Sequence, residues 1–463
     1  MKTLIVHAGL PRSGRPLLPL QAHLLVMAAR AAGHEAALLD LALTRQPLWA
    51  LHEKLDERFR AVVLVTGAVA ACDAAPSARR LSHLEQLAQS CHRARVRLIL
   101  SGDALTESPE GLCRWLKPHF GLIGDAEYAL PGLLDCLEDR VSPTDIPGLI
   151  TVHHGHVTSR SEPGSGDLAD LPVLWPLAID CAVPAADFAA WPVETKRGCG
   201  FACLHCARTD GGEWRLRDPR RVAEELVLGQ ATGQRMAEIA DASFGVPVDH
   251  AVACCEAISR RVRGLTLTTP SLHPRAATPR LLEAMEAASF GAVGVHAFSG
   301  SDDVLRRLQR GYSVADLRAA AAHLHALPAR KLWTFRFGAP GETPETVRQT
   351  VDFMQTLPSS DFILVRHGLP VLPRTGLQRL VGAQPEHAGN DQPTLRYYYS
   401  PHVSVEQVED ILSISPLSNR LRPRRGACAT ASAIQQALSL STTPAVAEEQ
   451  AAGLHLVREA LQV

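Results

Sequence analysis

Short apolar runs alternate with longer amphipathic stretches over the first 140 residues. Such runs are typical of buried strands, and the sequence predicts five, at 3–7, 36–40, 61–66, 96–101 and 120–123. Stretches rich in leucine and alanine predict helices between them, at 17–32, 82–94 and 111–117. This alternation favours an α/β fold with a doubly wound parallel sheet. Ligands of such sheets bind at the carboxyl ends of the strands, here the loops 8–16, 66–70, 101–107 and 124–128.

The pattern changes at residue 145. The segment 145–191 contains five prolines and the stretch SEPGSGD, so we interpret it as a linker with little regular structure. Beyond it, strands are expected at 193–196, 238–240, 264–268, 292–296, 332–337 and 362–367, with helices at 219–229, 281–288 and 344–357. Six such units predict a partial (β/α)6 barrel with its site at the strand ends. The expected domains are therefore 1–144, a linker 145–191, a barrel 192–378 and a mixed C-terminal segment 379–463.

Charge and composition exclude some partners. The 47 Lys and Arg residues balance 48 Asp and Glu residues, which gives no electrostatic reason to expect nucleic acid or an anionic membrane as the main partner. No apolar run reaches the ~18 residues of a transmembrane helix, and the N-terminus lacks the features of a signal peptide, so we expect a cytoplasmic protein. The odd number of cysteines, 11, argues against a disulfide framework.

Three of these cysteines form a distinctive group. Cys199, Cys203 and Cys206 have the spacing C-x3-C-x2-C and lie between a predicted strand and a predicted helix. Three thiolates on one short loop can hold three irons of a [4Fe–4S] cluster and leave the fourth iron open. Structural zinc is a competing interpretation, although it usually takes two separated ligand pairs and His205 is poorly spaced for it. A redox-active pair, Cys203 and Cys206, is a third.

The phrase TKRGCGFACLHC at 195–206 resembles the strand-to-cluster entry of radical S-adenosylmethionine (SAM) enzymes. The resemblance implies that the three cysteines hold the cluster, that SAM chelates the open iron, and that an electron donor such as flavodoxin or ferredoxin drives cleavage of SAM to a 5′-deoxyadenosyl radical. The cofactors would supply the difficult chemistry, and the protein would bind and orient them.

Further segments agree with this family. FGAPGET at 337–343 is similar to its turn after the fifth barrel strand, and residues 299–313 resemble the segment after the fourth. Many relatives place a Glu just before the Ser-Gly-Ser of that segment, where this chain has Phe298. Asp241 ends a predicted strand, and capping a turn is its alternative role to contacting SAM. The SAM contacts that the resemblance implies are His205, Asp241, His296, Ser299, Gly338, Pro340, Gly341 and Glu342.

The resemblance extends to members that carry an N-terminal, Rossmann-like cobalamin-binding domain. HGLPVLPRTGL at 367–377 and LRYYYSP at 395–401 are similar to their C-terminal segments, although the tyrosines also suit a packed aromatic strand. Because no Asp-x-His-x-x-Gly sequence occurs, the resemblance implies no histidine ligand below the cobalt; a domain that has lost cobalamin is the alternative. The implied cobalamin-binding residues are Thr66, Gly67, Ser101, Gly102, Asp103, Thr106, Gly124 and Glu127.

The function that the resemblance implies is methylation of an unactivated carbon in a small molecule or peptide. One SAM would methylate cobalamin, and a second would give the radical that abstracts a hydrogen atom from the substrate. The alternatives are a non-methylating radical SAM enzyme (rearrangement, cyclisation or oxidation) and a non-catalytic iron–sulfur or zinc protein. A methylthiotransferase would need three more N-terminal cluster cysteines, and Cys72, Cys91 and Cys113 lie on elements of a different pattern.

Overall fold

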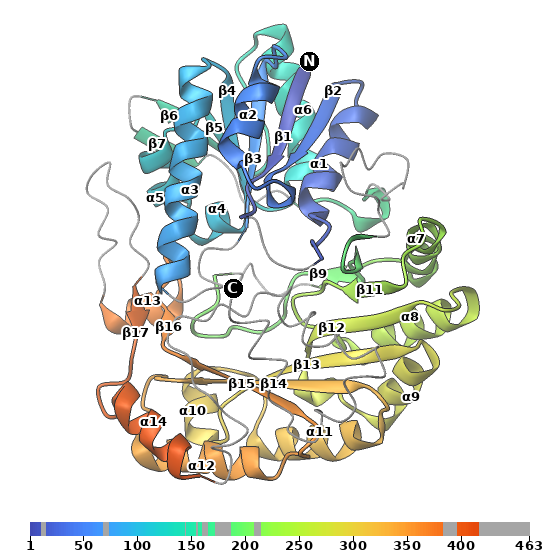
Figure 1. Cartoon of the computed structure of the whole chain (residues 1–463), viewed down its shortest axis with the longest axis vertical. Coiled ribbons are helices and arrows are strands. Elements are labelled where there is room, and N and C mark those ends of the chain that lie inside the picture. Colours follow the sequence, from blue (N-terminus) through green and yellow to red (C-terminus); the bar gives the residue numbers. More distant parts are fainter. Residues whose placement is uncertain are drawn as a thin grey trace. The chain divides into compact units, whose positions relative to one another are not determined.

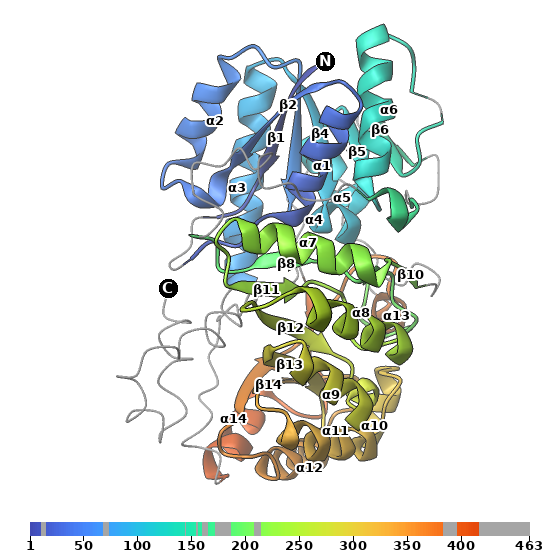
Figure 2. The same cartoon turned by 90° about the vertical axis from the view of Figure 1, so that its right-hand side faces the viewer.

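The computed structural model describes residues 1–10, 15–67, 74–143, 145–153, 156–159, 165–171, 187–207, 214–382 and 396–415 of the 463. The chain divides into two compact units, one spanning Met1–Phe188 and the other beginning at Ala189. Figures 1 and 2 show both units, each built on its own sheet. Among the described residues, no helix is long and apolar enough to span a membrane.

The first unit contains the predicted parallel sheet. Its strands are β1 (Lys2–His7), β2 (Glu35–Asp40), β3 (Ala61–Thr66), β4 (Arg97–Gly102) and β5 (Phe120–Leu122). They are ordered β2-β1-β3-β4-β5 and all run parallel. The order reverses at β1, so the polar loops that follow β1 and β3 lie where such sheets bind ligands.

Helices cover both faces of this sheet, as predicted (Figure 1). Side chains of α1 (Leu20–Ala31) and α6 (Ala126–Asp139) pack on one face, and those of α2 (Pro47–Leu55), α3 (Ala74–Arg93) and α5 (Pro109–Leu116) on the other. The sequence did not predict α2, α6 or the short α4 (Asp103–Glu107). A 3-10 turn, η1 (Leu41–Leu43), follows β2.

The expected linker is more regular than its prolines suggested. Strands β6 (Leu149–His153) and β7 (His156–Ser159) form a hairpin that pairs antiparallel with β5 and extends the first sheet. A 3-10 turn, η2 (Leu168–Asp170), follows. The antiparallel pairing saturates the backbone groups of β5, which would otherwise be an open sheet edge. The prediction of little regular structure was wrong for these residues, while 172–186 lie outside the described residues.

The second unit is a six-stranded, wholly parallel sheet with the order β15-β14-β13-β12-β11-β8. The strands are β8 (Trp191–Val193), β11 (Met236–Ile239), β12 (Thr266–Leu272), β13 (Phe290–Phe298), β14 (Arg330–Phe337) and β15 (Phe362–His367). The predicted strand at 193–196 is divided, because β9 (Lys196–Arg197) leaves the sheet to pair antiparallel with β10 (Arg215–Leu216).

Helices follow the strands along the outside of this sheet (Figure 2). They are α7 (Pro219–Ala231), α8 (Val248–Arg261), α9 (Pro279–Ala287), α10 (Asp302–Arg307), α11 (Val314–Ala326) and α12 (Pro344–Gln355), with the 3-10 turn η5 (Pro274–Ala276) before α9. As predicted, Asp218 caps α7, accepting a bond from the Arg220 backbone N–H. Phe353 of α12 packs against Trp333 and Phe335. The remaining elements are α13 (Gly376–Val381), a hairpin of β16 (Leu369–Pro370) and β17 (Tyr397–Tyr398), and α14 (Val405–Ile414).

Candidate functional site

The cysteine triplet lies on a loop that begins at the end of β9. Gly198 starts the loop with a φ of 87°, a left-handed conformation that glycine adopts without strain. The backbone N–H of Cys206 donates to the Cys203 carbonyl at 3.0 Å, so the last two cysteines share one tight turn. The N–H of Leu204 donates to the Leu308 carbonyl at 3.0 Å, which fixes the loop to the end of α10. All three thiols are partly exposed and free of disulfides.

Arg310 lies directly beside this triplet. Its Nη1 donates to the Sγ of Cys203 at 3.2 Å, and its Nε donates to the Tyr312 hydroxyl at 3.1 Å. The guanidinium also lies 3.9 Å from the ring centroid of Phe298, as in a cation–π contact. The Tyr312 hydroxyl and the Phe298 ring therefore hold the Arg310 guanidinium against the Cys203 sulfur.

Lys196, at the start of β9, is a second cation near the triplet. Lys196 is 3 % exposed, and its Nζ is buried without a hydrogen-bond partner in the part of the chain that the structure describes. Burial lowers the pKa of the ammonium, while the charges of Asp241 and Cys199 act in the opposite direction. A buried cation without a partner is costly, and a nearby anionic group would reduce that cost. A [4Fe–4S] cluster on three thiolates carries net negative charge, so Lys196 and Arg310 fit such a cluster at this loop.

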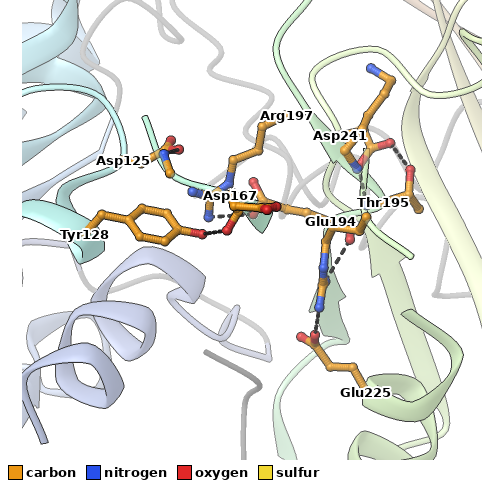
Figure 3. A network of polar contacts seen from close by, with 11 residues as sticks. Asp125, Tyr128, Asp167, Glu194, Thr195, Arg197, Glu225 and Asp241 are labelled. Atoms are coloured by element: carbon orange, nitrogen blue, oxygen red, sulfur yellow. Dashed lines mark hydrogen bonds and ion pairs between the residues drawn. The ribbon is translucent and has the colours of Figure 1, made fainter. Parts of the chain in front are cut away.

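Asp241 follows β11, and both of its carboxylate oxygens accept hydrogen bonds from Thr195 (Figure 3). Its Oδ1 accepts the Thr195 backbone N–H at 2.7 Å, and its Oδ2 accepts the Thr195 hydroxyl at 2.5 Å. Burial raises the pKa of this carboxyl to about 6, although Lys196 and these bonds favour the charged form. Asp241 thus fixes the chain between β8 and β9, the turn-cap role that the sequence left open. Its contact with SAM stays a prediction.

An aromatic layer packs beneath the loop. The ring of His273 stacks on Phe201 with centroids 4.3 Å apart and planes at 1°, and it meets Tyr312 edge-on at 5.4 Å. Both ring nitrogens of His273 are buried and unpartnered. Burial, and secondarily the charge of Arg310, lowers the pKa of His273 to about 4. His273 is therefore neutral at pH 7 and acts as an aromatic packing group for the loop.

The predicted histidines His205 and His296 also lie among apolar and cationic groups. The ring centroids of His205 and Phe298 lie 5.0 Å apart. The Nδ1 of His205 is buried and has no hydrogen-bond partner among the described residues. Burial, then Arg310, lowers the pKa of both rings, that of His296 to about 3. Both imidazoles are neutral, so they can donate or accept a hydrogen bond but cannot supply charge.

Of the other predicted SAM contacts, Ser299 is hydrogen-bonded to α12. Its residue is fully buried, and its Oγ lies 3.0 Å from the Thr350 Oγ1 on α12 and accepts the Ser301 backbone N–H at 3.1 Å. Phe298 occupies the position where relatives carry Glu, with a φ of 60° that is unusual for a bulky residue. The Glu carboxylate that relatives have at this position is thus replaced by the Phe298 ring, which packs against the Arg310 guanidinium.

The side chain of Glu342 accepts hydrogen bonds from the backbone of its own turn, residues 338–342. The fully buried Glu342 accepts backbone N–H groups of Gly338 and Ala339 at Oε2, while its Oε1 has no partner. Burial raises the pKa of Glu342 to about 7. Gly338 and Gly341 have φ values of 91° and 77°. Pro340 is buried within the same turn.

In the first unit, the predicted residues gather at the carboxyl end of the sheet. The Thr66 hydroxyl donates to the Ser101 carbonyl at 2.8 Å, and the fully buried Ser101 Oγ has no hydrogen-bond partner within the described ranges. Gly102 has a φ of 104°, and a Cβ there would lie 2.2 Å from the Thr66 carbonyl oxygen. The other predicted residues lie on the same edge: the exposed Gly67 and Gly124, Asp103 and Thr106 of α4, and Glu127 of α6.

The cysteines of the first unit do not form a second triplet among the described residues. Cys91 and Cys113 are fully buried on α3 and α5, and burial raises the pKa of each thiol to about 12. Cys72 lies outside the described residues. Within the described ranges, no three His, Cys, Asp or Glu side chains converge on one metal-ion position.

Three residues that the sequence analysis did not single out belong to this site: Lys196, His273 and Arg310. Arg310 and Lys196 lie inside the quoted motifs, so their charge beside three cysteines was a usable signal. His273 follows β12 at a distance in sequence from every motif, and no local pattern marks it.

The comparisons identify the domain that carries this loop. Residues 193–354 match the model of the radical SAM superfamily. A tryptophan 2-C-methyltransferase of Streptomyces laurentii is 27 % identical over 210 residues, which cover 42 % of this chain and 34 % of that protein. A tRNA-2-methylthio-N(6)-dimethylallyladenosine synthase of Chloroflexus aurantiacus is 30 % identical over 187 residues, which cover 37 % of this chain and 40 % of that protein. The chain thus spans between a third and two fifths of these relatives.

Two solved structures share the fold of nearly the whole chain. The methyltransferase TsrM from Kitasatospora setae, solved with cobalamin and a [4Fe–4S] cluster, superposes with a TM-score of 0.79 at 20 % identity, covering 99 % of this chain and 98 % of that one. The cobalamin-dependent enzyme OxsB, solved with aqua-cobalamin and SAM, gives 0.70 at 14 % identity, covering 89 % and 66 %. Residues 193–354 thus match the radical SAM superfamily, and the chain shares the fold of these two solved structures.

Proposed function

We propose that this protein is a cobalamin-dependent radical SAM enzyme that methylates a carbon atom of a small molecule. The observation that carries the proposal is the loop of three cysteines that form no disulfide, with the two basic residues Lys196 and Arg310 beside it. The likeness in fold to TsrM over both units supports a cobalamin domain in the same chain.

The residues of the second unit would divide the work. Cys199, Cys203 and Cys206 would hold the cluster, and His205 and the turn at 338–342 would contact SAM. When bound, the cluster supplies the electron that cleaves SAM, and cobalamin supplies the methyl group. Lys196 and Arg310 place positive charge beside the thiolates, and the aromatic layer of Phe201, His273 and Tyr312 excludes water from the base of the loop.

The first unit fits a bound cofactor at its carboxyl edge. Ser101 offers a buried hydroxyl that has no hydrogen-bond partner among the described residues, and Gly102 keeps the space above Thr66 free of a side chain. An unpaired buried hydroxyl is costly, so a ligand that bonds to Ser101 would stabilise this edge. We assign cobalamin to it.

The substrate class follows from the relatives only. One relative is named for methylation of tryptophan, and TsrM has been solved with tryptophan and a SAM analogue. L-Tryptophan is therefore the first substrate to test. Carbon 2 of an indole is a nucleophilic aromatic carbon, unlike the unactivated carbon expected from the sequence, so the two substrate types differ in whether a radical is needed. A flavodoxin or ferredoxin is the proposed electron donor.

The test begins with anaerobic reconstitution using iron, sulfide and hydroxocobalamin. We expect about four irons and one cobalamin per chain after desalting. Reaction with SAM that carries a trideuterated methyl group should then give a product three mass units heavier than the unlabelled methylated product. Formation of 5′-deoxyadenosine marks the radical route, and S-adenosylhomocysteine marks methyl donation by SAM.

Matched variants separate the roles of the two cofactors. The triple variant C199A/C203A/C206A should lose iron but keep cobalamin, whereas C136A removes a partly exposed thiol on α6 and should keep both. Iron without cobalamin in the wild-type protein would exclude the methyltransferase proposal and leave a non-methylating radical SAM enzyme. The replacement of the family's Glu by Phe298 favours that second candidate.

A further inference from the structure

Two arginines lie next to each other near the carboxyl end of the second sheet. Arg336 of β14 is in register with Arg366 of β15, and each is the last residue but one of its strand. Residues in register on neighbouring parallel strands project from the same face of a sheet, and the strands are about 5 Å apart. Both guanidinium groups can therefore reach one ligand.

This pair projects from the inner face of the sheet, away from helix α12. Phe335, which precedes Arg336, is fully buried, and its ring centroid lies 6.0 Å from that of Phe353 on α12. Because successive residues of a strand point to opposite faces, Arg336 points away from α12. His296 of β13 is in register with Thr334, two residues before Arg336, so His296 projects from the same inner face.

The turn after β15 holds Arg336 in place. The Nη1 of Arg336 donates to the Gly368 carbonyl at 2.5 Å, and the N–H of Gly368 donates to the Phe337 carbonyl at 2.8 Å. Gly368 has a φ of 72°, a left-handed conformation that glycine adopts without strain. A guanidinium has several N–H donors in a fixed fork, so an arginine held in this way can donate to a further acceptor.

Positive charges gather on this inner face. Burial, then the charges of Arg310, Arg366 and Arg336, lower the pKa of His296 to about 3, and no carboxylate among the described residues opposes them. Burial, then Arg310 and Arg336, lower the pKa of His205 as well. Three guanidinium groups thus lie near two neutral imidazoles, and an anion bound between them would relieve their mutual repulsion.

The proposed cofactors leave the positive charge of Arg336 and Arg366 uncompensated. A cluster on the three thiolates would lie beside Arg310, which donates to Cys203. SAM carries a sulfonium and an ammonium group against one carboxylate, so SAM adds net positive charge to the site. The substrate is the remaining source of an anion, and arginine binds planar carboxylates through two parallel N–H···O bonds.

We infer that Arg336 and Arg366 form a subsite that binds the carboxylate of the substrate, and that this substrate is a free amino acid. The inference rests on the proposed function, and it narrows the substrate class given there from a small molecule to one that carries a carboxylate. L-Tryptophan, the first substrate to test, has this group, whereas the interior of a peptide does not.

Equilibrium dialysis against matched pairs of compounds tests this subsite. Protein reconstituted with iron, sulfide, hydroxocobalamin and SAM is dialysed anaerobically against a mixture of the proteinogenic L-amino acids and their carboxamides, and the retained compounds are quantified by mass spectrometry. Each carboxamide keeps the amino group and the side chain but lacks the negative charge. We expect an amino acid to be retained and its carboxamide to bind about ten-fold more weakly.

Variants assign the preference to the two arginines. R336Q and R366Q should each weaken binding of the amino acid about ten-fold with little effect on the carboxamide, and R336K, which keeps the charge, should lose less. R330Q is the matched control, because Arg330 begins the same strand, on the same face but at its amino end; its preference should match the wild type. Circular dichroism and iron content show that each variant folds and holds the cluster.

The outcomes distinguish the sources of the carboxylate. Equal retention of amino acids and carboxamides, or of neither, by protein that has bound cluster and cobalamin would overturn the subsite while the proposed function stands. Weaker binding of ¹⁴C-labelled SAM to R336Q and R366Q, measured by the same dialysis, would assign the arginines to the carboxylate of SAM and exclude the substrate role. Absence of cobalamin from the reconstituted wild-type protein would overturn the proposed function, and this inference with it.

Discussion

At the scale of single residues, Arg310 is the group most closely tied to the chemistry of the cysteine loop. Its Nη1 donates to the Cys203 sulfur, and Phe298 and Tyr312 hold the guanidinium in place. Hydrogen bonds to cluster sulfurs and nearby charge set the reduction potential of an iron–sulfur cluster. A cation at 3.2 Å favours the added electron of the reduced state.

We therefore expect R310Q to shift the midpoint potential of the reconstituted cluster to more negative values. R310K should lie between R310Q and the wild type, because lysine keeps the charge but cannot reproduce the planar stacked geometry. A redox titration followed by electron paramagnetic resonance measures the shift. R318Q is the control, since Arg318 also lies over a phenylalanine ring but on α11, against Phe353. An unchanged potential in R310Q would show that the contact with Cys203 has no electrostatic effect on the cluster.

His273 makes the stability of the protein depend on pH. Its pKa is lowered from 6.5 to about 4 in the folded state by burial, so between these values the unfolded chain binds more protons. Stability from this residue is complete above pH 6.5 and is lost as the pH falls towards 4. At pH 5, the free energy of unfolding should be about 2 kcal/mol lower than at pH 7.5 because of this residue alone.

The variant H273F keeps an aromatic ring for stacking on Phe201 but cannot titrate. Urea unfolding of the apoprotein at several pH values should show a smaller loss of stability on acidification for H273F than for the wild type. Equal losses in the two proteins would mean that His273 takes up its proton without unfolding, and that the aromatic layer admits water.

At the scale of elements, hydrophobic alternation predicted strands better than helices. Strands β1 to β5 were located within about two residues, because a buried parallel strand is a continuous apolar run between polar loops. Helices α2 and α6 escaped prediction, and in α6 the interior Pro131 is a residue that disfavours a helix. The β6–β7 hairpin was missed because proline density around it suggested a linker, whereas its pairing with β5 is a tertiary effect.

The site shows the same limit of local patterns. Spacing was sufficient for the cysteine triplet, because all three thiols come from one loop. Spacing did not predict the hydrogen bonds that Asp241 and Ser299 make to Thr195 and Thr350, which lie 46 and 51 residues away in the sequence. The hydrogen bond of 2.7 Å between His7 and Asp40 depends on the register between β1 and β2, which only the folded sheet supplies.

At the scale of the whole molecule, the chain is built from two units, each with its own sheet and its own buried apolar clusters. The proposed cofactors divide between them, the cluster in the second unit and cobalamin in the first. A ligand that binds only the folded state suppresses local opening of the segments it contacts, which slows hydrogen exchange of their backbone amides. Each cofactor should therefore leave a separate footprint.

We expect hydroxocobalamin alone to slow exchange at the carboxyl ends of β1, β3 and β4, and iron with sulfide alone to slow it at 198–206 and around Arg310. Peptide-level hydrogen exchange with mass spectrometry on the full chain, loaded with neither, either or both, measures the two footprints. The variant C199A/C203A/C206A should lose only the second one. The absence of a footprint in protein that has bound the corresponding cofactor would contradict the placement of that cofactor in its unit.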